Sequence, residues 1–223
     1  MCVVAMILTL PIETILLRAI SNPSSQDGAH AWVSGLSTDG LDAAADQVQA
    51  YPLVYRKEIL RALNGGGRAK VWARHIAKYR DRHPELSPAA GELLDEATAL
   101  LTPEFFSAPT SDERARAKQI GDQLVLLIGR EEAEYVLYRL GPRDGTFASA
   151  EPLAERAVNW VRRAITLFAN AEDCDCSSDW GCGMAATCRT STSCAPDTDW
   201  PACGWLWNET CDGLCSVSGS SSN

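Results

Sequence analysis

The stretch RAKVWARHIAKYRD, from Arg68 to Asp81, decides the fold class of this 223-residue chain. Its apolar side chains recur at steps of three and four residues, which puts them on one face of an α-helix: Val71, Trp72, Ile76 and Tyr79. Lysine and arginine occupy several of the positions between them. The stretch therefore predicts an amphipathic helix whose apolar stripe packs against other helices.

The same period returns on both sides of this stretch. Pro52 stands at the start of one predicted helix, and Ser87 with Pro88 supplies the N-cap and first position of another. A capping-type sequence at 110–113 precedes a long periodic run. We expect helices over 41–50, 52–63, 68–81, 87–101, 111–128, 131–140 and 150–169, and a short helical turn over 102–106.

Turn-forming residues separate these segments. Residues 21–28 have the composition of a turn and linker, and the glycine triplet at 65–67 is interpreted as the C-cap and turn after helix 52–63. Gly129 either breaks or bends the chain between two helical runs. Strand patterns are almost absent before residue 171.

The sequence thus predicts a mainly α protein, an all-helical bundle followed by a small, irregular, disulfide-rich module. We expect an apolar and linker segment at 1–30, a helical body at 31–170 and a cysteine-rich tail at 171–223. Residues 3–10 are apolar, but no basic residue precedes them, so a secretory signal, a buried helix and a start codon assigned too far upstream all remain open.

Eight of the nine cysteines lie in the tail. A segment of about 40 residues cannot bury enough apolar surface to fold on its core alone, and disulfides are the usual remedy. An even number of cysteines predicts up to four disulfides and an oxidising compartment. These residues are Cys174, Cys176, Cys182, Cys188, Cys194, Cys203, Cys211 and Cys215.

Metal binding and thioether crosslinking are two other uses of cysteines in such a segment. Structural zinc prefers C-x2-C pairs, often with histidine, whereas the tail has C-x-C, C-x3-C and C-x5-C spacings and no histidine, so no metal or cofactor is expected. Serine and threonine residues are interleaved with the cysteines and could form thioether rings after dehydration. The even count favours disulfides, and the thioether alternative stays open.

Most of the negative charge lies in the tail. Eight acidic residues against one arginine give it −7 of the formal −9. This balance argues against nucleic acid, which proteins hold through lysine and arginine. No apolar run approaches the roughly 18–20 residues of a membrane span.

The tail also carries four of the seven tryptophans. So small a module cannot hide four indoles, and exposed aromatic side chains mark contact surfaces. We expect a target or membrane contact formed by Trp180, Trp200, Trp205, Leu206 and Trp207. The alternative is that these rings cover the disulfides as a miniature core.

The body shows no catalytic constellation, so we do not expect an enzyme. His75 is expected at the surface or half-buried, and the acidic run at 131–134 is expected on a solvated helix face. The basic residues between Tyr55 and Arg82 are expected to contact the acidic tail. Pairing of these bases with nearby acids is the alternative.

Four strings carry a resemblance to a known family: YPLVYRKEIL at 51–60, VWARHIAKYRDRHPEL at 71–86, LLTPEFF at 100–106 and the whole cysteine pattern at 174–215. They are similar to proteins grouped as bacteriocin fulvocin C-related. The shared tail features are the C-x-C opening, cysteines at near-equal steps and the closing Cys-Asp-Gly turn. The resemblance implies a precursor whose cysteine-rich end is an antibacterial peptide.

A precursor of this kind needs a cleavage site and partners. Small residues before the first tail cysteine suit a peptidase, and we expect cleavage within Phe168, Ala169, Asn170, Ala171, Glu172 and Asp173. The expected partners are a processing peptidase, an exporter and a bacterial cell-surface target. The precursor is expected to be cytoplasmic or membrane-proximal, and the tail extracellular.

A second function remains open. The chain can instead be an uncleaved helical interaction or regulatory protein, in which the cysteine-rich tail stabilises the body or senses metal or redox state.

Overall fold

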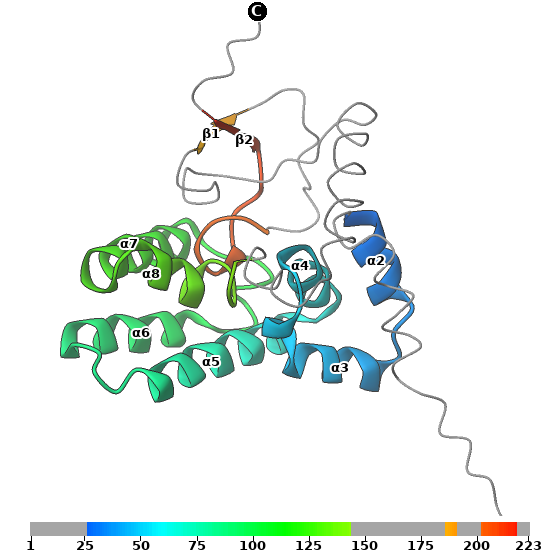
Figure 1. Ribbon diagram of the computed structural model, residues 1–223, viewed down its shortest axis with the longest axis horizontal. Helices are drawn as coiled ribbons and strands as arrows, with labels where there is room; N and C mark the ends of the chain where they lie inside the picture. The colour runs from blue at the N-terminus through cyan, green and yellow to red at the C-terminus, as the bar shows by residue number, and fades with distance from the viewer. Residues whose placement is uncertain (1–25, 144–185, 191–201, 218–223) are drawn as a thin grey trace, which may run out of the picture.

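The computed structural model describes residues 26–143, 186–190 and 202–217 (Figure 1). The predicted fold class is confirmed, because these residues are mainly helical with a small strand and disulfide region near the C-terminus. The helices are α2 (Gln26–Ser34), α3 (Thr38–Asp46), α4 (Leu53–Ala62), α5 (Gly65–Arg82), α6 (Pro88–Leu100), α7 (Ser111–Ile128) and α8 (Arg130–Leu137). The 3₁₀ helices are η1 (Val48–Ala50) and η4 (Trp205–Trp207), and the strands are β1 (Ala186–Thr190) and β2 (Gly213–Val217).

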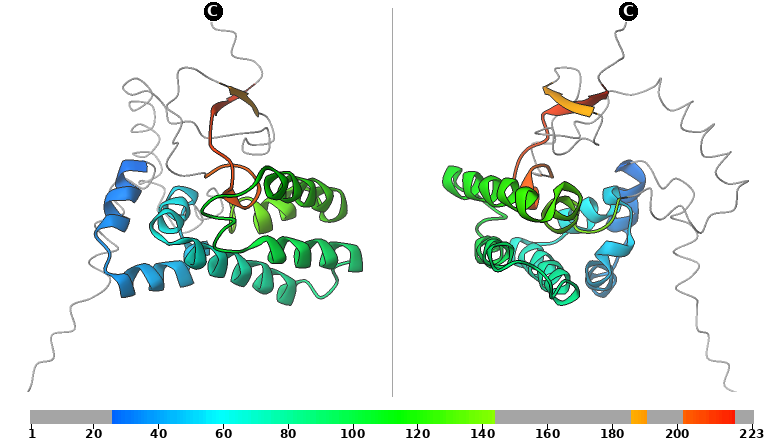
Figure 2. Two further views of the ribbon diagram at one scale, coloured as in Figure 1. Left: turned by 180° about the vertical axis from the view of Figure 1, so that it is seen from behind. Right: turned by 60° about the vertical axis from the view of Figure 1, so that its left-hand side comes forward.

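The helices form two packed groups that meet at α4 and α5. Helix α4 packs against α2 and α3, while α5 contacts α6 and α8, and α7 contacts both α6 and α8 (Figures 1 and 2). The stripe on α5 is buried as predicted, with Val71, Trp72, Ile76 and Tyr79 all between 0% and 4% exposed. Helix α5 thus places its apolar face in the centre of the body.

Two helix starts agree with the capping residues in the sequence. The Ser87 Oγ accepts a hydrogen bond from the Ala90 amide at 3.3 Å, and Pro88 opens α6. Thr110 and Glu113 form a reciprocal capping box at the start of α7. In both cases side-chain oxygens satisfy amides that have no partner within the helix.

The glycine triplet at 65–67 departs from the prediction. It forms the first turn of α5 and not a turn after α4. Asn64 is the N-cap, and its Oδ1 accepts from the Gly67 amide at 2.8 Å. A good capping residue followed by a strongly periodic run outweighs the low helix propensity of glycine.

Three smaller predictions also need correction. Helix α2 begins at Gln26, inside the stretch predicted as linker, and the segment 102–106 forms turns and not a helix. Residues 41–50 are divided between α3 and η1. Gly129, with φ of 85°, interrupts the helical run and separates α7 from α8. The predicted helix at 150–169 and residues 1–20 lie outside the described residues.

The tail contributes a two-stranded antiparallel sheet. Strand β1 pairs with β2 so that the Cα atoms of Cys188 and Cys215 are partners. This sheet was not predicted, because its strands are short and lack a clear alternation of apolar and polar residues. Among the described helices, none combines the length and the apolar character needed to cross a membrane.

Candidate functional site

Residues 202–211, called here the tryptophan loop, form a closed ring. A disulfide joins Cys203 to Cys211. Inside this ring the backbone amides and carbonyls of Cys203 and Glu209 exchange two hydrogen bonds of 2.9 Å. The loop therefore has a covalent closure and a backbone closure at nearly the same place.

The tip of the loop adopts an uncommon backbone conformation. Leu206 and Trp207 have φ of 59° and 52°, the left-handed region that L-residues rarely occupy. Gly204 has φ of 74°, and a Cβ there would lie 2.5 Å from the Cδ of Glu209. Such conformations persist where surrounding contacts outweigh their cost, and the side chains of the tip supply those contacts.

Trp207 is held by two groups of the helical body. Its indole Nε1 donates a hydrogen bond of 2.6 Å to the backbone carbonyl of Tyr138. Its ring meets Trp72 of α5 edge to face, with centroids 5.4 Å apart and planes at 81°. This arrangement satisfies the single donor of a buried indole and the preferred geometry of two aromatic rings.

Trp205 lies in a notch on α7. A Cβ built on Gly121 would come within 2.2 Å of the Trp205 ring. Tyr138 meets the other side of this indole edge to face, with centroids 5.6 Å apart. Any side chain at position 121 would displace the indole, so the absence of a Cβ there makes the contact possible.

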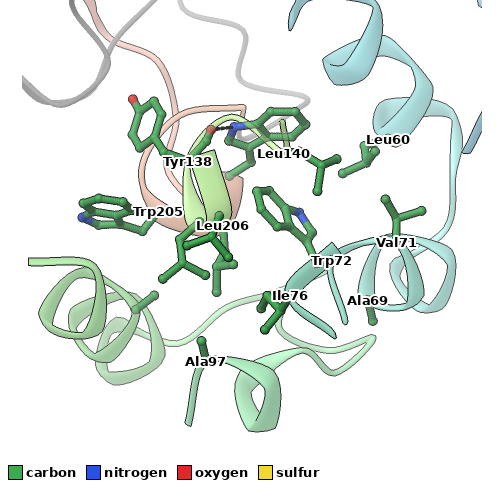
Figure 3. Close-up of a cluster of buried hydrophobic side chains, with 14 of the residues drawn as sticks. Leu60, Ala69, Val71, Trp72, Ile76, Ala97, Tyr138, Leu140, Trp205 and Leu206 are labelled. Carbon is green, nitrogen blue, oxygen red and sulfur yellow. Dashed lines mark hydrogen bonds between the residues drawn. The ribbon is translucent and has the colours of Figure 1, made fainter. Parts of the chain in front are cut away.

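Leu206 stands between the two tryptophans in the sequence. It is fully buried and belongs to the same apolar cluster as Trp72 and Ile76 of α5 (Figure 3). We call Trp72, Gly121, Tyr138 and the apolar residues around them the seat of the tryptophan loop. The seat and the loop tip share one core.

The predicted exposure of Trp205, Leu206 and Trp207 is wrong for the intact chain, in which they are 0–2% exposed. The prediction treated the tail as a separate module with too small a core, whereas the helical body supplies the missing apolar partner. Sequence reasoning missed Gly121 and Tyr138 as site residues. An isolated glycine inside a helical run was the available signal for the first.

One disulfide of the tail is described with both partners, Cys203–Cys211, and Cys188 is also disulfide-bonded. Of Cys215 only the backbone is described. The remaining site predictions lie outside the described residues: Cys174, Cys176, Cys182, Cys194, Trp180, Trp200 and the cleavage region Phe168, Ala169, Asn170, Ala171, Glu172 and Asp173.

His75 lies beneath the seat as a buried, neutral histidine, and not at the surface or half-buried as expected. Its Nε2 donates to the Tyr135 carbonyl at 2.9 Å, and its Nδ1 accepts from the Gln49 side chain at 2.8 Å. Burial lowers the pKa of His75 to about 4. Both ring nitrogens are occupied by structural hydrogen bonds, which argues for a packing role.

The acidic run at 131–134 was expected on a solvated helix face, but Glu134 is buried. It is 1% exposed and forms ion pairs with Arg130 and Arg143 at 2.6 and 2.9 Å and with Arg139. Burial lowers the pKa of Arg139 to about 10, so this arginine stays charged at neutral pH. The cluster neutralises a buried carboxylate of α8, next to the segment that carries Tyr138.

Several of the basic residues between Tyr55 and Arg82 find partners within the body. Arg74 pairs with Asp46 and Arg80 with Asp95. Arg68 donates to three backbone carbonyls, those of Leu60, Arg61 and Phe106. The body–tail contacts described above are apolar and aromatic, with one hydrogen bond from Trp207 to the Tyr138 carbonyl. Most acidic residues of the tail lie outside the described residues, so the expected charge pairing stays a prediction.

Within the described ranges, no group of three or more His, Cys, Asp or Glu side chains is placed to hold a metal ion. Comparisons of the chain with protein-family models, with curated proteins and with solved structures found no match. The chemistry of the described site is recognition of two indoles and a leucine by aromatic edges, a backbone carbonyl and a notch at a glycine.

Proposed function

We propose that the chain is a bacteriocin-like antimicrobial precursor in which the helical body covers the aromatic tip of a disulfide-stabilised peptide. The observation that supports this proposal is the burial of Trp205, Leu206 and Trp207, which are 0–2% exposed in the intact chain. The resemblance of the cysteine pattern to fulvocin C-related bacteriocins supports it independently.

Covering this tip has a physical purpose. Exposed apolar patches bind membranes and other proteins, and tryptophan in particular combines a large apolar ring with a polar edge. While the tip is seated, these side chains are withdrawn from any target. Release of the tail from the body exposes them, so the peptide becomes active when it leaves the body after cleavage.

The charge of the tail limits the class of target that it can bind. With eight acidic residues and one arginine, the tail has no electrostatic attraction to anionic lipid. The proposed target is therefore a specific component of a competitor's surface, recognised through the tryptophans. The disulfide between Cys203 and Cys211 suits an extracellular site of action.

Growth inhibition by the oxidised chain, before and after cutting, tests this proposal. A protease recognition sequence replaces residues 168–173 of the full-length protein, and the tail fragment is purified after cutting. We expect the free tail to inhibit competitor bacteria and the uncut chain to be at least about tenfold less active. A Trp205→Ala, Trp207→Ala tail is the control and should be inactive. A tail fragment without activity on any strain would contradict the proposal.

One observation favours the alternative of an uncleaved interaction protein. The loop tip is part of the same buried cluster as the body, so loss of the tail opens a cavity beside Trp72. The intact mass of the native protein separates the two functions. A fragment beginning near Ala171 supports the precursor, and full-length protein alone supports the uncleaved protein.

A further inference from the structure

We propose that the seat binds the tryptophan loop as a separable ligand, so that the body retains the tail non-covalently after the chain is cut. The inference takes the cleavage from the proposed function but does not require the tail to kill bacteria. It assigns a second role to the helical body, that of an inhibitor which captures its own released peptide.

The loop has the properties of an independent ligand. Its disulfide and its paired backbone hydrogen bonds close it at Cys203, Glu209 and Cys211 without help from the body. A ligand closed in this way loses less conformational freedom on binding than an open chain does. The loop therefore does not need a covalent connection to α8 in order to present its tip.

The seat has the properties of a receptor. It offers an aromatic edge from Trp72, an acceptor from the Tyr138 carbonyl and a notch at Gly121, each from a different segment of the body. Each of these groups engages one identified part of the loop tip. This combination selects a closed peptide that carries one indole on each side of a leucine.

The contact has the anatomy of a tight interface. Strong binding sites concentrate their free energy in a few fully buried aromatic anchors, with tryptophan the most frequent. Trp205 and Trp207 are both anchors of this kind, at 2% and 1% exposed. The tail of the same chain is the proposed occupant, because its loop already lies in the seat.

Retention depends on the disulfide. A dithiol reductant transfers two electrons and two protons to Cys203 and Cys211, which become thiols, while the dithiol becomes a disulfide. The opened loop then has to be ordered on binding, and its affinity falls. The body is thus expected to hold the oxidised tail and to release the reduced one.

The experiment uses the oxidised full-length chain with a protease site in place of residues 168–173. After cutting, native size-exclusion chromatography followed by mass spectrometry shows whether the two fragments stay together. We expect them to co-elute when oxidised and to separate after reduction. Separation of the oxidised fragments immediately after cutting would overturn the inference.

Two glycine variants test the seat itself. Gly121→Ala should raise the dissociation constant of the cut fragments by at least about tenfold, because the new methyl group collides with Trp205. Gly91→Ala is the matched control, since it also lies inside a helix and its Cβ meets only an Arg80 nitrogen at 3.9 Å. Equal retention of the tail by both variants would show that the loop does not bind at Gly121, and would refute the proposed seat.

Two tail variants keep the test valid if Gly121→Ala folds poorly. Trp207→Phe removes the donor to Tyr138, and the Cys203→Ser, Cys211→Ser pair removes the loop closure, while neither changes a residue of the body. Both should weaken retention, and unchanged retention in both would contradict the inference. If the body retains the cut tail but the free tail does not inhibit growth, only the proposed function is contradicted. If the free tail inhibits growth but the body does not retain it, only this inference is contradicted.

Discussion

His75 joins three elements of the body through a single neutral imidazole. Its ring is 2% exposed, and its two nitrogens contact η1 and α8 from a position on α5. Protonation would convert Nδ1 from an acceptor into a donor facing the Gln49 amide nitrogen, unless that amide turned over. The folded state therefore resists protonation of this residue, which agrees with its lowered pKa.

The stability of the protein should depend on pH through His75. Its pKa is about 4 in the folded protein, whereas the ordinary value for histidine is 6.5. As the pH falls below 6.5, the unfolded chain binds a proton that the folded chain does not, so stability is lost between about pH 6.5 and 4. The loss is expected to be about 3 kcal/mol. Urea unfolding at pH 7, 5.5 and 4 measures it.

His75→Gln is the comparison for this measurement. Glutamine can donate to the Tyr135 carbonyl and accept from Gln49, but it does not titrate in this range. The pH dependence of the variant should be weaker than that of the wild type by the amount assigned to His75. Parallel curves for the two proteins would show that His75 is protonated as easily in the folded state as in the unfolded state.

At the scale of helices and strands, the starts and ends follow local chemistry. Helix α7 begins where Thr110 and Glu113 cap one another, with the Glu113 amide donating to the Thr110 Oγ1 at 3.2 Å. The return hydrogen bond runs from the Thr110 amide to the Glu113 carboxylate at 2.8 Å. This pattern was predictable, because all of its atoms lie within four consecutive residues.

Thr110→Ala should lower the free energy of unfolding by about 1 kcal/mol, because it removes the N-cap acceptor. Thr98→Ala is the matched control. Its hydroxyl donates to the Leu94 carbonyl within α6, and alanine is the better helix former there. Chemical denaturation followed by circular dichroism measures both. A loss in the Thr98 variant equal to that at Thr110 would speak against a specific role for the cap.

The glycine triplet shows where local reasoning fails at this scale. Glycine is frequent in turns and rare within helices, so residues 65–67 were predicted as a turn. The Asn64 side chain caps the first turn of α5 and lets the helix begin at Gly65. The capping residue was present in the sequence. Composition could not decide whether residues 64–67 end the preceding helix or begin the next one.

At the scale of the whole molecule, the tryptophan loop and the helical body behave as one packed unit. Trp207 bonds to a carbonyl 69 residues earlier in the chain. Trp207→Ala in the uncut protein should therefore lower the free energy of unfolding of the helical body by about 3–5 kcal/mol, through the cavity it leaves beside Trp72. The helical signal in urea unfolding measures this loss.

Leu126→Ala is the control for this substitution. Leu126 is 85% exposed on α7, so its truncation should change stability by less than about 0.5 kcal/mol. If tail and body folded independently, the loss of Trp207 would leave the helical transition unchanged, and the shared core would be refuted.

The sequence by itself determined the helical class, most helix positions, two of the caps and the concentration of cysteines near the C-terminus. These features depend on periodicity and on contacts within about four residues, and a sequence displays both directly. Only the tertiary structure decided that Trp205 lies in the notch at Gly121 and that Trp207 meets Trp72 and Tyr138. These partners are remote in the chain, and their contact depends on how the helices pack and on which apolar face the body leaves for the loop to cover.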